Sequence, residues 1–155
     1  MTDSKSSTQQ LISQRQVARR LAMIAIYQWQ MTQNSYQDIY LAIQDDRDLS
    51  KDFRKADPIY FQGLVRYVIE HQQEIDGLFT PLLDREVDML DQIELAALRL
   101  ATTELKNHQE VPYKVVVNES VNLTKKFGAD QAHKFVNGVL DKLARQIRTL
   151  ETGGA

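Results

Sequence analysis

The sequence predicts an all-α protein, and two observations carry this prediction. Apolar side chains recur at three- and four-residue spacing along most of the chain, whereas the apolar and polar alternation typical of strands is scarce. The 155 residues include only six glycines and three prolines, and none of them lies before Pro58. We therefore expect six or seven helices in two short bundles that share an interface, within one domain spanning residues 1–155.

Turn-forming residues place the first boundaries. A long helix is expected over residues 11–33, after a disordered tail of residues 1–10, and it ends at the turn-forming residues 34–35. A shorter helix follows over residues 36–44. The acidic segment 45–57 is polar enough to form a loop with at most one helical turn, and it divides the chain into two helical halves.

The second half opens with a helix signal and a break. Asp57 and Pro58 supply an N-cap and a proline at the first helical position. Gly77 and Pro81 then interrupt the pattern, so a short helical piece is expected over residues 78–83.

A capping box is expected at the start of the next helix. Asp91 is followed three residues later by Glu94, and the helical period continues from there to about residue 106.

Residues 111–141 carry the strongest signal and predict two helices joined at a glycine. Pro112 suits a first helical position, and Gly128 is expected to end this helix in the left-handed conformation. Gly138, inside the second helix, indicates the close approach of another backbone, because glycine there costs roughly 1 kcal/mol against alanine. The buried stripe predicted for the second helix consists of Ala132, Phe135, Val136, Val139, Leu140, Leu143 and Ile147. Residues 150–155 are expected to be a disordered tail.

Composition narrows the class of protein. There is no cysteine, so disulfides and thiolate metal sites are excluded, and the three histidines show no metal-ligand spacing. The N-terminus is polar and unlike a signal peptide, and no apolar run approaches the ~20 residues needed to span a bilayer. We expect a soluble, cytoplasmic protein without metal or cofactor.

The net charge of −2 hides an uneven distribution. Residues 1–37 carry a net charge of +3, residues 38–110 of −8, and residues 111–155 of +3. The basic ends can meet an anion and the acidic middle a basic protein, but the charge distribution taken alone favours charges that simply solvate helix faces.

The first helix carries the clearest candidate binding surface. Residues 4–37 lack acidic side chains but include Lys5, Arg15, Arg19 and Arg20. Cations without nearby carboxylates point to an anionic partner. On a helical wheel of ~100° per residue, the predicted core face consists of Leu11, Ala18, Leu21, Ala22, Ala25 and Trp29.

Tyr27 lies opposite that core face, about 20° from Arg20 on the wheel, with Gln16 and Met23 close by. Arginine pairs with phosphate and an exposed tyrosine can stack on an unpaired base, so this surface predicts contact with single-stranded RNA. In the alternative, Tyr27 packs within the fold and the arginines are only solvated. The residues alone favour neither.

No motif of a known enzyme class is present. The chain contains no phosphate-binding glycine loop, dinucleotide fingerprint or nucleophile elbow. Catalytic groups can still assemble in space, so this absence lowers the enzyme hypothesis below the binding hypothesis without excluding it.

Four segments together resemble the NusB family of bacterial transcription antitermination factors. They are R-x-x-x-R-R-L-A-x-x-A-I-Y-Q from Arg15, LDQIELAALRL from Leu90, VPYKVVVNESVNLTKKFG from Val111, and HKFVNGVLD from His133. The likeness covers most of residues 15–143, and the last two segments are its most specific part.

The resemblance implies two three-helix bundles packed together and no catalysis. It also implies that the chain pairs with the ribosomal protein known in this role as NusE, that the pair binds the boxA element of nascent ribosomal RNA, and that it joins an RNA polymerase antitermination complex. Glu94 matches a position on the partner surface, although a capping role explains it equally well. The RNA contacts implied by the family are Arg15, Arg19, Arg20, Tyr27, Lys134 and Phe135.

One departure from the family pattern affects affinity. Gln16 and Val17 stand where arginines often occur, so RNA binding without the partner is expected to be weak. The competing hypotheses are a helical module related to the RNA-binding domain of ribosomal RNA cytosine methyltransferases, without catalysis, and a helical interaction protein with no RNA role. A small-molecule enzyme is the least favoured class.

Overall fold

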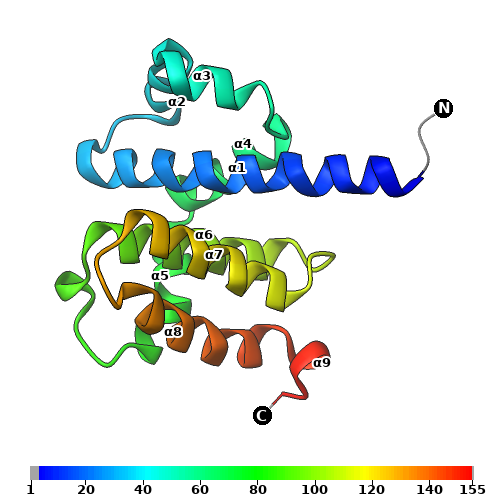
Figure 1. Cartoon of the computed structure of the whole chain (residues 1–155). Coiled ribbons are helices and arrows are strands. Elements are labelled where there is room, and N and C mark those ends of the chain that lie inside the picture. Colours follow the sequence, from blue (N-terminus) through cyan, green and yellow to red (C-terminus); the bar gives the residue numbers. More distant parts are fainter. Residues whose placement is uncertain (1–3, 155) are drawn as a thin grey trace. The chain divides into compact units, whose positions relative to one another are not determined.

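The computed structural model describes residues 4–154, and within them the chain is built of helices and connecting turns, with no strand. The all-α prediction is confirmed. These residues hold nine α-helices and two 3-10 helices, more than the six or seven expected (Figure 1). The chain divides into two compact units, residues 1–66 and residues 67–155.

The first unit is built on the long helix α1 (Ser4–Thr32), against which α2 (Tyr36–Asp45) and α3 (Arg47–Phe53) pack. Helix α1 starts seven residues before the predicted position, so residues 4–10 are helical rather than a disordered tail. The rest of that predicted tail, residues 1–3, lies outside the described residues.

Helix α3 occupies most of the acidic segment predicted as a loop. Its N-cap is Asp46, whose carboxylate accepts hydrogen bonds from the backbone N–H groups of Asp48 and Leu49, both at 2.9 Å. An aspartate in this position satisfies N–H groups that the first helical turn leaves unpaired. The segment was therefore wrongly predicted, because its polarity masked a capped helix of seven residues.

The start of α4 (Pro58–Glu70) is as predicted. The Asp57 carboxylate accepts a hydrogen bond from the backbone N–H of Tyr60 at 3.0 Å. The backbone N–H of Asp57 in turn donates to the carbonyl of Gln14 at 3.1 Å, which fixes the beginning of α4 beside α1.

The second unit is centred on α6 (Gln92–Asn107), which packs against both α7 (Tyr113–Phe127) and α8 (Ala132–Ile147). Every residue of α6 from Glu94 to Leu105 is buried, so this helix is covered on all sides. Helices α7 and α8 also pack against one another.

The elements before and after these helices are shorter. They are α5 (Gln72–Phe79), the 3-10 helices η1 (Thr80–Leu82) and η2 (Val87–Met89), and α9 (Thr149–Thr152). Gly77 lies inside α5 and does not interrupt it, so the break predicted there is wrong. The short helical piece predicted over residues 78–83 is present as the last residues of α5 followed directly by η1. Helix α9 likewise forms in the segment expected to begin the C-terminal tail; Ala155 lies outside the described residues.

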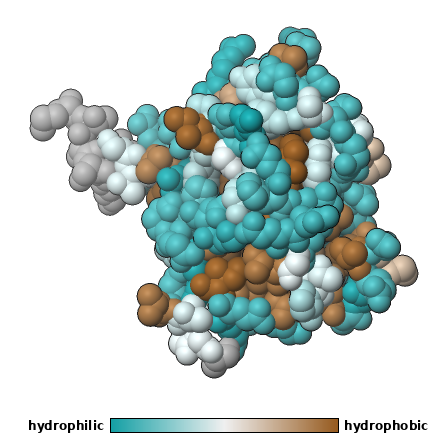
Figure 2. Space-filling model, turned by 180° about the vertical axis from the view of Figure 1, so that it is seen from behind, coloured by the Kyte–Doolittle hydropathy of each residue, from teal (hydrophilic) through white to brown (hydrophobic). Residues whose placement is uncertain are grey.

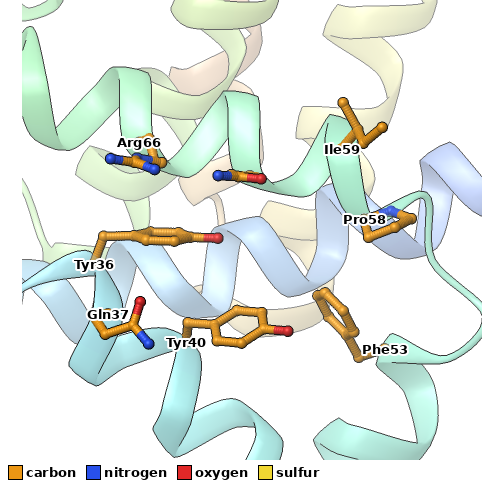
Figure 3. A pocket seen from close by; sticks show the side chains of 8 residues that line it. Tyr36, Gln37, Tyr40, Phe53, Pro58, Ile59 and Arg66 are labelled. Atoms are coloured by element: carbon orange, nitrogen blue, oxygen red, sulfur yellow. The ribbon is translucent and has the colours of Figure 1, made fainter.

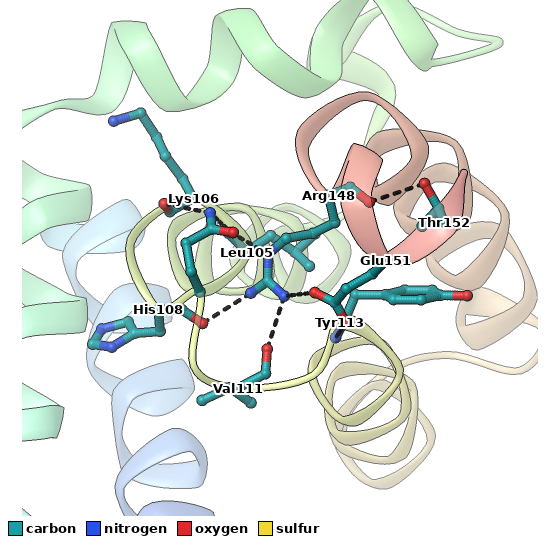
Figure 4. Close-up of polar contacts among 9 residues, drawn as sticks. Leu105, Lys106, His108, Val111, Tyr113, Arg148, Glu151 and Thr152 are labelled. Atoms are coloured by element: carbon teal, nitrogen blue, oxygen red, sulfur yellow. Dashed lines mark hydrogen bonds and ion pairs between the residues drawn. The ribbon is translucent and has the colours of Figure 1, made fainter. Parts of the chain in front are cut away.

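A buried arginine ties the end of α8 to the connection between α6 and α7 (Figure 4). Arg148 is 2% exposed and donates hydrogen bonds to the backbone carbonyls of Leu105 and Val111, both at 2.8 Å, and of His108 at 2.9 Å. It also forms an ion pair with Glu151. One guanidinium thus satisfies three carbonyls that the connection leaves without helical partners.

Two glycine predictions are wrong. Gly128 has an extended backbone, with φ −94° and ψ 176°, rather than a left-handed one. Glycine fits there because an added Cβ would lie 2.7 Å from the carbonyl oxygen of Thr124. Gly138 is exposed and has nothing within 4 Å of such a Cβ, so no backbone approaches it closely.

The surface drawn in Figure 2 is mainly hydrophilic, with separate hydrophobic patches. None of the helices in residues 4–154 combines the length and the apolarity that a bilayer span requires. The exposed large hydrophobic side chains include Ile59, Met89 and Leu150.

Candidate nucleic-acid interface

Two of the predicted arginines on α1 converge on one aromatic ring of α4. The guanidinium carbon of Arg15 lies 4.5 Å from the centroid of the Tyr60 ring, and that of Arg19 lies 5.7 Å from it. Their spacing of four residues puts both side chains on the same side of α1. The ring therefore holds two cations through cation–π contact.

These two arginines differ in exposure. Arg19 is only 4% exposed, so the fold buries a side chain that the sequence placed among the RNA contacts. Arg15 is half-buried, and its Nε is a buried donor without a hydrogen-bond acceptor. A donor in that state costs about 1–3 kcal/mol, which lowers the cost of moving the side chain to an anion.

Arg20 and Tyr27 occupy another side of α1. The Arg20 guanidinium lies 3.2 Å from the Asp52 carboxylate of α3, and both side chains are about one-third exposed. Tyr27 is half-buried.

The buried face of α1 is wider than the predicted core face, and it begins further along the helix than Leu11. Met23, expected on the outward surface, is 1% exposed, and Ile26 is fully buried, whereas Leu11 is 44% exposed. A helical wheel assigns one apolar face, but between Ala18 and Gln30 no side chain of this helix is fully exposed. The outward surface is therefore smaller than predicted.

In the second unit, Phe135 does not belong to the core stripe of α8. Its ring is half-buried and lies beneath Arg85, whose guanidinium carbon is 4.1 Å from the ring centroid. Arg85 also forms an ion pair with Asp84 at 2.9 Å. Neighbouring Lys134 is exposed. Arg85 could not be predicted from the sequence, because a contact across about fifty residues has no local signal.

The capping box predicted at α6 is confirmed. The backbone N–H of Glu94 donates to Asp91 at 2.7 Å, and the backbone N–H of Asp91 donates to Glu94 at 3.1 Å. Glu94 is 7% exposed. Burial raises the pKa of its carboxyl, while the hydrogen bond from the Asp91 backbone opposes that rise. Its role toward a partner stays a prediction.

The described residues place no group of three or more metal-ligating side chains together. Cations and aromatic rings lie close together on α1 and α4 in one unit, and around Phe135 in the other. Surfaces of this composition are able to hold anions and flat rings.

Comparisons with known proteins identify the class. A family model described as the NusB family matches residues 16–145. The transcription antitermination protein NusB of Idiomarina loihiensis is 49% identical over 134 residues, covering 86% of this chain and 94% of its own. Its counterpart in Teredinibacter turnerae is 50% identical over 139 residues, covering 89% and 92%.

A solved structure of NusB from T. maritima superposes with a TM-score of 0.70 at 27% identity, covering 85% of this chain and 91% of that one. The chain therefore belongs to the NusB family of transcription antitermination proteins, which are not enzymes. The resemblance inferred from the sequence is confirmed.

Proposed function

We propose that this protein acts in the cytoplasm as an RNA-binding antitermination factor: together with NusE it binds the boxA element of nascent ribosomal RNA and helps RNA polymerase to read through terminators. The observation that carries this proposal is the presence of Arg15, Arg20 and Tyr27 on α1, within a stretch, residues 4–37, that contains no Asp or Glu. Family membership supports the antitermination role.

Arg15 and Arg20 are proposed to contact phosphates. Each arginine makes only weak contacts in the free protein. Arg15 stacks on Tyr60 while its Nε has no hydrogen-bond acceptor, and Arg20 forms a partly exposed ion pair with Asp52. Exposed ion pairs contribute only about 0–1 kcal/mol, so a phosphate can replace the carboxylate at little cost. Tyr27 is proposed to stack on an unpaired base.

Arg19 is proposed to act differently from its neighbours. Because it is buried over Tyr60, it holds that ring beneath Arg15 and so positions Arg15. Lys134 is proposed to contact a phosphate directly, because its side chain is exposed. Phe135 is proposed as a second stacking ring, uncovered when Arg85 moves from its face to the RNA backbone.

The partner surface is proposed to use the acidic middle of the chain. Residues 38–110 carry a net charge of −8, which favours a basic ribosomal protein such as NusE. Glu94 lies in this region, but its burial and its bonds to Asp91 leave little of it for contact. We expect its replacement to act mainly through the start of α6.

Transcription in vitro tests the function. A template carrying boxA before a terminator is transcribed with NusE and the other Nus factors, with and without this protein. The proposal predicts more readthrough when the protein is added, and only when boxA is intact. Equal readthrough with intact and disrupted boxA, or equal readthrough with and without the protein, would refute the proposal.

Variants test the site. Tyr27→Ala and Arg20→Glu should each weaken boxA binding while helicity and NusE binding stay near wild type. Arg145→Glu is the matched control, because Arg145 also forms a partly exposed ion pair, with Asp141 at 3.3 Å. Equal loss of binding in the control would show only a general effect of charge, and unfolding of the Tyr27 or Arg20 variant would show their surface to be structural.

A further inference from the structure

A cavity of about 250 Å³ opens within the first unit, away from the residues discussed above (Figure 3). It lies between α2, the end of α3 and the start of α4. None of the candidate RNA-binding or partner-binding residues lines this cavity. The lining residues that matter here are Tyr36, Gln37, Tyr40, Phe53, Gln62 and Arg66.

One side of the cavity is a row of aromatic rings. Tyr36 and Tyr40 lie four residues apart on α2, with ring centroids 6.1 Å apart and planes inclined by 31°. The Tyr40 ring meets Phe53 edge-on at 5.7 Å, and Phe53 meets the buried Phe61 at 5.2 Å. The row is thus anchored in the core at one end, while both tyrosines are only half-buried.

The polar side chains of the cavity come from α2 and α4. Gln62 and Arg66 lie one turn apart on α4, and Gln37 follows Tyr36 on α2; all three are exposed. The Arg66 guanidinium carbon lies 5.3 Å from the centroid of the Tyr36 ring. Figure 3 shows Arg66 beside Tyr36 and the Gln37 amide beside Tyr40. No carboxylate lines the cavity, and Arg66 is its one charged lining residue among the described residues.

We propose that this cavity binds one unpaired nucleotide of a single-stranded RNA, outside the segment held by α1. A base would stack on Tyr36 or Tyr40, since every base offers a flat π-face. The amides of Gln37 and Gln62 have the donors and acceptors that base edges require, and Arg66 supplies a cation for the phosphate. This inference rests on the proposed function that the protein binds single-stranded RNA.

Size and charge select a nucleotide over other occupants. The volume falls below the ~300 Å³ at which pockets accept drug-sized ligands, which suits a single base. A peptide side chain would fill the aromatic part equally well, but it would not offer the several planar donors and acceptors that the amides of Gln37 and Gln62 can pair with. The flat rings and the planar polar groups together match a base with its phosphate.

Titration of the full chain with 5′-mononucleotides tests the cavity without boxA. Backbone amide signals are followed by NMR while AMP, GMP, CMP or UMP is added in separate samples, with inorganic phosphate as the control. The inference predicts saturable shifts at Gln37, Tyr40 and Gln62 with at least one nucleotide and not with phosphate. Shifts elsewhere only, or equal shifts with phosphate, would overturn it.

Binding of extended RNA tests the same site in its proposed use. Affinity is measured with NusE for boxA alone and for boxA lengthened by unpaired nucleotides on either side. The gain from the added nucleotides should fall about fivefold or more in Tyr36→Leu and Arg66→Gln, the loss expected when one stacked base is released. Affinity for boxA alone should not change.

Matched controls and distinct outcomes separate the two proposals. Tyr113→Leu and Arg145→Gln remove a half-buried tyrosine and an exposed arginine of the second unit and should leave the gain intact. Wild-type protein that binds no boxA would defeat the proposed function, whereas boxA binding with no gain from the added nucleotides would defeat only the cavity inference. Weaker NusE binding by the Tyr36 or Arg66 variant, with RNA binding unchanged, would assign the cavity to a protein partner and overturn the inference.

Discussion

Replacing Arg148 with methionine should destabilise the protein by about 3 kcal/mol. The side chain is 2% exposed, and its guanidinium is the hydrogen-bond donor for the backbone carbonyls of Leu105, His108 and Val111. A buried carbonyl left without a donor costs about 1–3 kcal/mol. Without Arg148 the Val111 carbonyl loses its donor, whereas the Leu105 carbonyl keeps a hydrogen bond from the Gln109 side-chain amide at 3.1 Å. Hydrogen bonds from a charged donor contribute about 1.5–3 kcal/mol each, so losing the two buried ones costs about 3–6 kcal/mol, from which the burial of the methionine side chain recovers a part.

Urea denaturation followed by far-UV circular dichroism measures this loss. Trp29 is the single tryptophan and lies in residues 1–66, so its fluorescence reports separately on the first unit, which contains none of these contacts. Arg145→Met is the control: Arg145 is exposed, and its ion pair with Asp141 is worth at most about 0.5 kcal/mol. A loss below about 1 kcal/mol for Arg148→Met would refute the reasoning that the guanidinium holds this connection together.

Three further changes test other parts of the fold. Val139→Asp should prevent stable folding, because Val139 is 4% exposed and an unpaired charge would enter the interior; a folded, stable variant by circular dichroism would contradict the packing of α8. Asp91→Ala should cost about 1 kcal/mol in urea denaturation through loss of the N-cap of α6, while Asp88→Ala, at an exposed position, should cost little. The hydrogen bond from the Tyr113 backbone, together with Arg148, lowers the pKa of the Glu151 carboxyl below its ordinary 4.5. Ionised Glu151 therefore stabilises the fold above pH 4.5, and this stabilisation is lost as the pH falls through the pKa of Glu151 in the folded protein. The stability difference between wild type and Glu151→Gln should therefore shrink on acidification from pH 6, and a constant difference would contradict the assignment.

Features that depend on neighbouring residues could be predicted from the sequence. The caps at Asp57 and Asp91 are examples, because a helix start is decided within about four residues. The all-helical class was predictable for the same reason, since the apolar period is local. The helix over the acidic segment was not, because the capping aspartate Asp46 is surrounded by other aspartates and does not stand out.

Features that depend on contacts between distant residues could not be predicted. The stacking of Arg85 on Phe135 and the three carbonyl bonds of Arg148 join positions that are about 40 to 50 residues apart, and arginine side chains are ordinarily exposed. The burial of Arg19 is of this kind too, because a wheel places it beside Arg20 and Arg15 but gives no sign of the Tyr60 ring that covers it. The residue types of the candidate RNA-binding surface could therefore be predicted from the sequence, but the burial of Arg19 could not.

Fluorescence anisotropy with labelled boxA RNA tests the central claim most directly. Binding is compared with that of a scrambled RNA, with and without NusE, at two salt concentrations. We predict a preference for boxA that NusE strengthens and that added salt weakens, because phosphate contacts release bound counterions. Equal affinity for boxA and scrambled RNA under every condition would contradict the account and leave a helical protein-interaction module in its place.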